Sequence, residues 1–167
     1  MKHRQIRYMI ISALLAAAVT ALILAFKIPI PGTGGYVHLG DSVIYLASYL
    51  LPAPYAAAVG ALGGALADLS VGAAVYVFPT AVIKAMMAWE ASVFFKRSKK
   101  MSAKFAALAL GTLILVGGYF LFELLVWGWA YAVSGILWNL IQGIAGGLFY
   151  LVLFKAADLI KGRFEKN

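Results

Sequence analysis

Long apolar segments alternate with short polar or glycine-rich ones along the whole chain. Most of the apolar segments approach the roughly 20 residues that a helix needs to cross a bilayer. They predict six helices, at residues 8–26, 39–51, 55–71, 75–95, 105–127 and 135–160. The pattern therefore predicts an all-α integral membrane protein with six transmembrane helices in a single domain, residues 1–167, and no soluble module.

The stretch Ile28–Asp41, with the sequence IPIPGTGGYVHLGD, interrupts this pattern after the first helix. Pro29 and Pro31 remove backbone donors, and several glycines add freedom, so the stretch is not expected to be helical. An ordered irregular segment between membrane helices either lines a site or simply joins two spans. We expect this segment to cap a ligand site at the outer face.

The composition supports the membrane assignment, because 64% of residues are hydrophobic and only 12% are charged. The mean hydropathy of +0.94 leaves too little polar surface to cover a soluble domain. The absence of cysteine excludes disulfides, iron–sulfur clusters and thiolate metal sites. A net charge of +8 could indicate nucleic-acid binding. The positive residues gather at helix ends, however, so we expect no nucleic-acid partner.

The basic residues predict the orientation in the membrane. They fall at the N-terminus, after the fourth helix and at the C-terminal end: Lys2, Arg4, Arg7, Lys96, Arg97, Lys99, Lys100, Lys104, Lys155, Lys161, Arg163 and Lys166. Six spans bring these three regions to one side, and the other side carries only Lys27. The positive-inside rule then places both termini in the cytoplasm.

Most polar groups inside the apolar segments fall in the outer half of the predicted bilayer. On a scale of about 1.5 Å per residue, Asp68 and Glu123 each lie roughly 6 Å below an outer helix end. A pocket open only to the outside would concentrate polar groups in this way, whereas an ion pathway would line the full thickness. The candidate substrate-binding residues are Tyr36, His38, Asp41, Asp68, Lys84, Tyr119, Glu123, Trp138, Asn139 and Gln142.

Each candidate also has a simpler interpretation. Asp68 and Lys84 can pair with each other, and Asp41 can cap the second helix. His38 can be a plain loop residue, and the amides of Asn139 and Gln142 can bond neighbouring helices. Aromatic residues such as Tyr76, Trp127, Trp129 and Tyr131 are typical of an interfacial belt. Glu90 lies too deep for the pocket, so a structural or partner-facing role is expected.

Several kinds of chemistry have no support in the sequence. No nucleotide-binding loop of the GxxxxGK[ST] type occurs, and His3 and His38 are the only histidines, so neither an ATPase site nor a zinc site is expected. We therefore expect no catalytic residue, no metal and no cofactor bound by this chain.

Alanines recur every four residues in the first helix, at positions 13, 17, 21 and 25. They place a strip of small side chains on one face, which lets another helix approach closely. The strip either packs inside the protein or docks a partner, and composition alone favours internal packing.

The chain resembles the substrate-binding S components of energy-coupling factor (ECF) transporters, the group-II vitamin importers. The resemblance covers nearly the whole chain and rests on the alanine strip, the loop IPIPGTGGYVHLGD, the segment PAPYAAAVGALGGALADLSVG and the later KAMMAWE. It implies an outward-facing vitamin pocket, closed by the loop after the first helix, in the cell membrane of a prokaryote. The pyridoxine or hydroxymethylpyrimidine subgroup looks most similar, and riboflavin, thiamine, folate, biotin and queuosine precursors remain open.

The same resemblance implies partners. They are a transmembrane coupling protein (EcfT-like) and two cytosolic ATPases (EcfA-like) that use ATP, and docking to the coupling protein is assigned to Ala13, Ala17 and Ala21. Two other hypotheses stay open from the residues alone. One is an independent secondary carrier or channel for a small polar solute, and the other is a membrane enzyme or assembly factor.

Overall fold

The computed structural model describes residues 2–30 and 35–165, and within them the fold is all-α, as predicted. The helices are α1 (Lys2–Ala25), α2 (Asp41–Leu50), α3 (Ala53–Ser70), α4 (Val77–Arg97), α5 (Met101–Trp127) and α6 (Trp129–Glu165). A short 3-10 turn, η1 (Ala74–Tyr76), leads into α4. Two strands of two residues, β1 (Ile28–Pro29) and β2 (Tyr36–Val37), form an antiparallel pair between α1 and α2.

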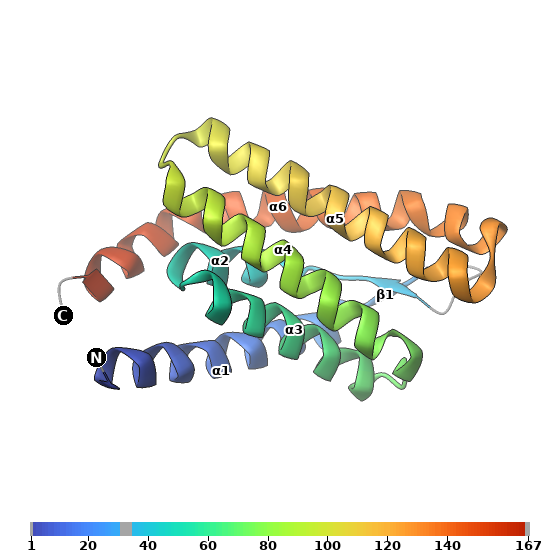
Figure 1. Cartoon of the computed structure of the whole chain (residues 1–167), viewed down its shortest axis with the longest axis horizontal. Coiled ribbons are helices and arrows are strands. Elements are labelled where there is room, and N and C mark those ends of the chain that lie inside the picture. The colour runs from blue at the N-terminus through green and yellow to red at the C-terminus, as the bar shows by residue number, and fades with distance from the viewer. Residues whose placement is uncertain (1, 31–34, 166–167) are drawn as a thin grey trace.

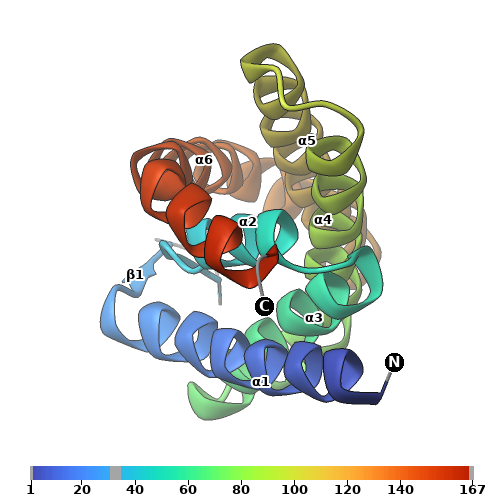
Figure 2. The ribbon, with the colours of Figure 1, turned by 90° about the vertical axis from the view of Figure 1, so that its left-hand side faces the viewer.

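The long helices form a bundle around the short helix α2 (Figures 1 and 2). Helix α3 packs against α1 and α4, and α5 packs against α4 and α6. Helix α2 contacts α1, α3, α4 and α6, and most of its residues are buried. Its central position explains why a stretch of only ten residues contributes so much of the core.

Small residues allow a close contact between α3 and α4. A Cβ added at Gly60 would lie only 2.5 Å from the backbone carbonyl oxygen of Lys84. Glycine at this position therefore lets the two backbones approach more closely than any other residue would allow.

Among the residues that the structure describes, four helices are long and apolar enough to cross a membrane, over His3–Ala25, Ala74–Arg97, Met101–Trp127 and Trp129–Phe154. The protein is therefore a multi-pass membrane protein. Helix α2 has ten residues and is about 15 Å long, which is half of a hydrocarbon core.

Several helices extend beyond the predicted bounds. Helix α1 begins at Lys2 rather than at residue 8, and α6 begins at Trp129 rather than at residue 135. Hydropathy marks the part of a helix that suits hydrocarbon and does not mark where the helix ends. The predicted ranges therefore exclude the polar or aromatic turns at the helix ends. The predicted loop between α5 and α6 is reduced to Gly128, whose φ of +84° permits the sharp turn.

The segment after α1 is not helical in its described part, as expected, and carries the β1–β2 pair. Pro31, Gly32 and Gly34 lie outside the described residues.

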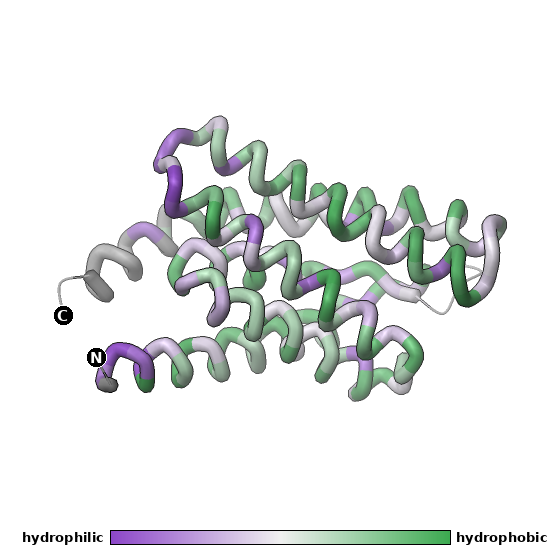
Figure 3. Tube along the Cα trace, in the orientation of Figure 1, coloured by the Kyte–Doolittle hydropathy of each residue, from purple (hydrophilic) through white to green (hydrophobic). Residues whose placement is uncertain are grey.

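Both ends of the chain and the α4–α5 connection lie at one end of the bundle (Figure 1). The strand pair, η1 and the α5–α6 turn lie at the other end (Figure 1). Hydrophilic residues mark the N-terminus and the α4–α5 connection (Figure 3). Lys104 departs from the predicted basic loop, because it is buried and its Nζ lies 3.1 Å from the centroid of the Phe154 ring.

Candidate functional site

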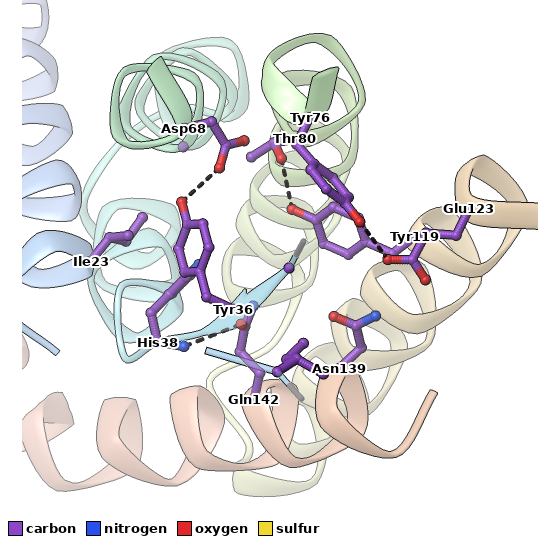
Figure 4. Close-up of a pocket in the computed structure, with 13 residues that line it drawn as sticks. Ile23, Tyr36, His38, Asp68, Tyr76, Thr80, Tyr119, Glu123, Asn139 and Gln142 are labelled. Atoms are coloured by element: carbon purple, nitrogen blue, oxygen red, sulfur yellow. Dashed lines mark hydrogen bonds between the residues drawn. The ribbon is translucent and has the colours of Figure 1, made fainter. Parts of the chain in front are cut away.

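A pocket of about 430 Å³, including its opening to solvent, lies in the half of the bundle that holds the strand pair. Its walls come from β2, α3, η1, α4, α5 and α6 (Figure 4). These elements are far apart in the sequence and meet at the pocket. The lining residues are Ile23, Ile30, Gly35, Tyr36, His38, Gly64, Asp68, Tyr76, Thr80, Tyr119, Glu123, Asn139 and Gln142.

One wall is formed where β2 meets the end of α3. The register of the strand pair places Tyr36 opposite Pro29, and the Tyr36 hydroxyl donates to Asp68 Oδ1 across 2.6 Å. Burial and the hydrogen bond to Asp68 raise the pKa of Tyr36, so this hydroxyl remains a donor at physiological pH. Asp68 is buried, and its second oxygen, Oδ2, has no partner among the described residues.

The opposite wall comes from η1, α4 and α5. Tyr76 donates to Glu123 Oε1 across 3.0 Å, and the hydroxyls of Thr80 and Tyr119 lie 2.9 Å apart. The rings of Tyr76 and Tyr119 meet edge to face, with centroids 6.1 Å apart. Glu123 Oε2 is buried and has no partner in the part of the chain that the structure describes.

Asn139 and Gln142 project from α6, three residues apart and on the same face, as predicted. Gln142 Oε1 accepts from the His38 backbone N–H across 3.2 Å, and its Nε2 donates to Asp41 Oδ2 across 3.0 Å. Gln142 thereby ties the segment after β2 to the interior of the bundle.

His38 lies at the end of the same segment and is buried. Burial lowers the pKa of His38 to about 4, so the imidazole is neutral at physiological pH. Its Nδ1 accepts a hydrogen bond from the Gly40 backbone N–H across 3.2 Å. His38 therefore shapes the turn into α2 and carries no positive charge into the pocket.

Seven of the ten candidate residues line the pocket: Tyr36, His38, Asp68, Tyr119, Glu123, Asn139 and Gln142. Asp41 and Lys84 do not, because they form a fully buried ion pair of 2.6 Å with each other. The alternative pairing of Lys84 with Asp68 is therefore wrong. Asp41 is the first residue of α2, but α2 has no side-chain N-cap hydrogen bond, so the capping interpretation is also wrong.

Trp138 is not among the residues that line the pocket, although it lies one turn before Gln142 on α6. Tyr76 and Thr80 also line the pocket, although neither is among the candidates from the sequence, where Tyr76 is typical of an interfacial belt. Helical spacing could have indicated both Gly64 and Thr80. Gly64 lies four residues before Asp68, and Thr80 lies four residues before Lys84, so each shares a helix face with a polar candidate.

The alanine strip of α1 faces outward. Ala13, Ala17 and Ala21 are exposed, whereas α1 packs on the bundle through a neighbouring face that includes Ala16 and Val19. The expectation of internal packing for these alanines is therefore wrong.

Known proteins resemble this chain over most of its length. The family model of the ECF-type riboflavin transporter S component matches residues 3–158. The thiamine precursor transporter HmpT of Lactococcus lactis subsp. cremoris (strain MG1363) is 30% identical over 154 residues, which are 92% of this chain and 89% of the relative. An uncharacterized protein of Pyrococcus woesei is 29% identical over 149 residues, which are 86% of this chain and all of the relative.

The family match covers nearly the whole helical bundle, including every residue that lines the pocket. The match therefore concerns the same domain that holds the site. On these findings, the chain belongs to the family of ECF transporter S components.

Proposed function

We propose that this chain captures a small water-soluble vitamin or vitamin precursor at the outer face of a prokaryotic plasma membrane and delivers it as the S component of an ATP-driven ECF transporter. The favoured substrates are of the pyridoxine or hydroxymethylpyrimidine class. The observation that carries the proposal is the pocket at one end of the bundle, beneath the β1–β2 strand pair and far from the basic end. The name of the Lactococcus relative, a thiamine precursor transporter, supports the same class.

The charge distribution supports the orientation. The exposed basic residues Arg4, Lys96, Arg97, Lys99 and Lys100 lie at the end of the bundle that carries both termini. The positive-inside rule assigns that end to the cytoplasm, so the pocket faces outward. Six membrane crossings are part of this proposal, with α2 and α3 inserted in the bilayer alongside the four longer helices.

The exposed alanine strip supports a partner in the membrane. Ala13, Ala17 and Ala21 offer a shallow surface on α1 that another helix can approach closely. We assign this surface to the transmembrane coupling protein, with two cytosolic ATPases supplying ATP hydrolysis. The chain itself then acts as a binding subunit without a cofactor and without catalysis.

The test combines binding and uptake. The purified chain is screened against a panel of vitamins and precursors by thermal shift and titration calorimetry. Tight binding of one small heterocycle by the chain alone is expected, with uptake only when the coupling protein and ATPases are added. Uptake by the chain alone, driven by an ion gradient, would instead support an independent secondary carrier.

A further inference from the structure

Outside the pocket, the buried polar side-chain atoms that lack a hydrogen-bond partner within the described residues belong to three side chains. They are both carboxyl oxygens of Glu90 on α4, the hydroxyl of Tyr45 on α2 and the hydroxyl of Tyr150 on α6. Tyr45 and Tyr150 are fully buried, and the centroids of their rings lie 6.0 Å apart. Most buried polar groups in folded proteins have a partner, so this cluster requires a physical explanation.

Gly111 on α5 marks the point where Tyr45 and Glu90 meet. A Cβ built at Gly111 would collide with the Tyr45 hydroxyl oxygen and would lie 3.0 Å from Glu90 Oε1. The hydroxyl and the carboxyl group therefore approach the same point of α5 from α2 and α4, without a hydrogen bond to each other. Thr112 is a further neighbour of the Tyr45 hydroxyl, but its own hydroxyl donates to the backbone carbonyl of Leu108 across 2.8 Å.

Glu90 has no counter-charge in the part of the chain that the structure describes. Two lysines are buried there: Lys84 forms the ion pair described above, and Lys104 lies against an aromatic ring of α6. The basic residues at the end of α4, Lys96 and Arg97, are exposed. A carboxylate that is buried without a counter-charge is so unfavourable that the group takes up a proton instead.

The helices packed against α4 bring no other titratable group to Glu90 except Tyr45. These neighbours are α2, α3, α5 and η1. Within the described residues, their remaining titratable side chains are engaged elsewhere: Asp41 with Lys84, Tyr49 with Asp158, Tyr55 with Tyr8, Lys104 with Phe154, and Asp68, Tyr76, Tyr119 and Glu123 in the pocket wall.

We propose that Glu90 is a proton-binding site, carried in the folded protein as a neutral carboxylic acid beside the Tyr45 hydroxyl, where α2, α4 and α5 meet. Loss of the proton would leave an unpaired charge at this junction and weaken the contact between the three helices. The site is distinct from the pocket, since Glu90 lies about 9 Å beyond Lys84 along α4, toward the basic end of the bundle (Figure 1). The inference does not depend on the proposed function.

The proposal fixes the sign of a pH dependence. In the unfolded chain a glutamate has the ordinary pKa of about 4.3, so it is ionised at neutral pH. The folded protein keeps the proton above that value and therefore binds more protons than the unfolded chain. Stability then falls as the pH rises.

The variant Glu90→Gln keeps the size and polarity of the neutral acid but cannot ionise. Melting temperatures of the purified full-length chain in one detergent are compared with those of the variant from pH 5 to pH 9. The two proteins should melt within about 2 °C of each other at pH 5, and the variant should gain about 4 °C or more on the unchanged chain by pH 9. His38 is present in both proteins, so its titration cancels in the difference.

Glu90→Met, an apolar residue of similar length, is a second variant without a proton to lose. Its melting temperature should depend on pH in the same way as that of Glu90→Gln, so the result does not depend on one substitution. A difference from the unchanged chain that stays constant from pH 5 to pH 9 in both variants would overturn the inference.

Infrared spectroscopy reads the charge state directly. The unchanged chain at pH 7 should show the carbonyl band of a protonated carboxyl group, and Glu90→Gln should lack that band. Asp158→Asn is the matched control, because Asp158 is an exposed carboxyl residue near the end of α6 and its removal should leave the band in place. A spectrum in which no protonated-carboxyl band depends on Glu90 would also overturn the inference.

Discussion

Lys84 Nζ donates to Asp41 Oδ1 across 2.6 Å, and neither side chain is exposed to solvent. The pair joins α4 to α2, and the second oxygen of Asp41 accepts from Gln142 on α6. Gln142 in turn accepts from the backbone of His38, next to β2. A continuous set of hydrogen bonds therefore connects the segment that covers the pocket to an ion pair inside the bundle.

Removal of one partner of this pair should destabilise the protein strongly. Lys84→Met leaves Asp41 buried without its counter-charge, which costs about 3–5 kcal/mol in comparable pairs. The double variant Lys84→Met with Asp41→Leu should recover much of this loss, because no unpaired charge remains. Thermal denaturation of the two variants in one detergent measures the difference. Equal stability of the single variant and the unchanged chain would contradict the pairing.

The link through Gln142 should matter for ligand binding. Gln142→Ala removes both the hydrogen bond to the His38 N–H and the one to Asp41, so the segment after β2 is held less firmly over the pocket. At about 1 kcal/mol per hydrogen bond, we expect affinity for the substrate to fall roughly tenfold or more. Gln5→Ala is the matched control, since Gln5 is exposed on α1 and far from the pocket lining. A similar loss in both variants would exclude this role for Gln142.

Acidification should destabilise the protein through His38. Its pKa is lowered to about 4 by burial, while the unfolded chain has the ordinary value of about 6.5. Between these two values the unfolded state binds more protons than the folded state, so stability falls as the pH falls. The slope is steepest, at a little over about 1 kcal/mol per pH unit, midway between the two values.

The measurement compares melting temperatures from pH 7 down to pH 4 for the unchanged chain and for His38→Asn. The asparagine keeps an acceptor for the Gly40 N–H but does not titrate in this range. The variant should lose less stability on acidification. Parallel curves for the two proteins would show that His38 does not contribute.

The sequence reasoning reached the helical class, the irregular segment after α1 and most pocket residues because each depends on local signals. Runs of apolar residues, paired prolines and polar residues at one depth are all visible along the chain. The sequence did not predict which side chains pair with each other, because this depends on how helices that are distant in the sequence pack together. Asp41 and Lys84 are 43 positions apart, and nothing near Asp41 indicates that α2 lies in the centre of the bundle.

The contact between α3 and α4 should not tolerate a side chain at Gly60. A methyl group there would lie 2.5 Å from the Lys84 carbonyl oxygen, which belongs to a rigid helix backbone, so Gly60→Ala should cost about 1–3 kcal/mol. Gly117→Ala is the matched control, because the added Cβ would meet nothing within 4 Å. The control should be neutral or slightly stabilising, since alanine favours helices over glycine by up to about 1 kcal/mol. Melting temperatures that fall equally in both variants would contradict the close approach.

Bulky residues on the outer face of α1 should separate binding from uptake. Ala17→Leu enlarges an exposed residue, so the purified chain should keep its affinity for the substrate. Uptake by cells that contain the complete transporter should be lost, because the coupling protein can no longer approach α1 closely. Leu14→Ala, at another exposed position of α1, is a control that removes bulk and should retain uptake. Unchanged uptake by Ala17→Leu would rule out the docking assignment.

The central claim is that a vitamin-class ligand enters a pocket open only to the outer side of the membrane. The most direct measurement is binding of labelled hydroxymethylpyrimidine and pyridoxine to sealed membrane vesicles of known orientation that contain this chain alone. We predict binding to right-side-out vesicles without permeabilisation, and binding to inside-out vesicles only after they are opened. Equal binding by sealed inside-out vesicles would contradict the account.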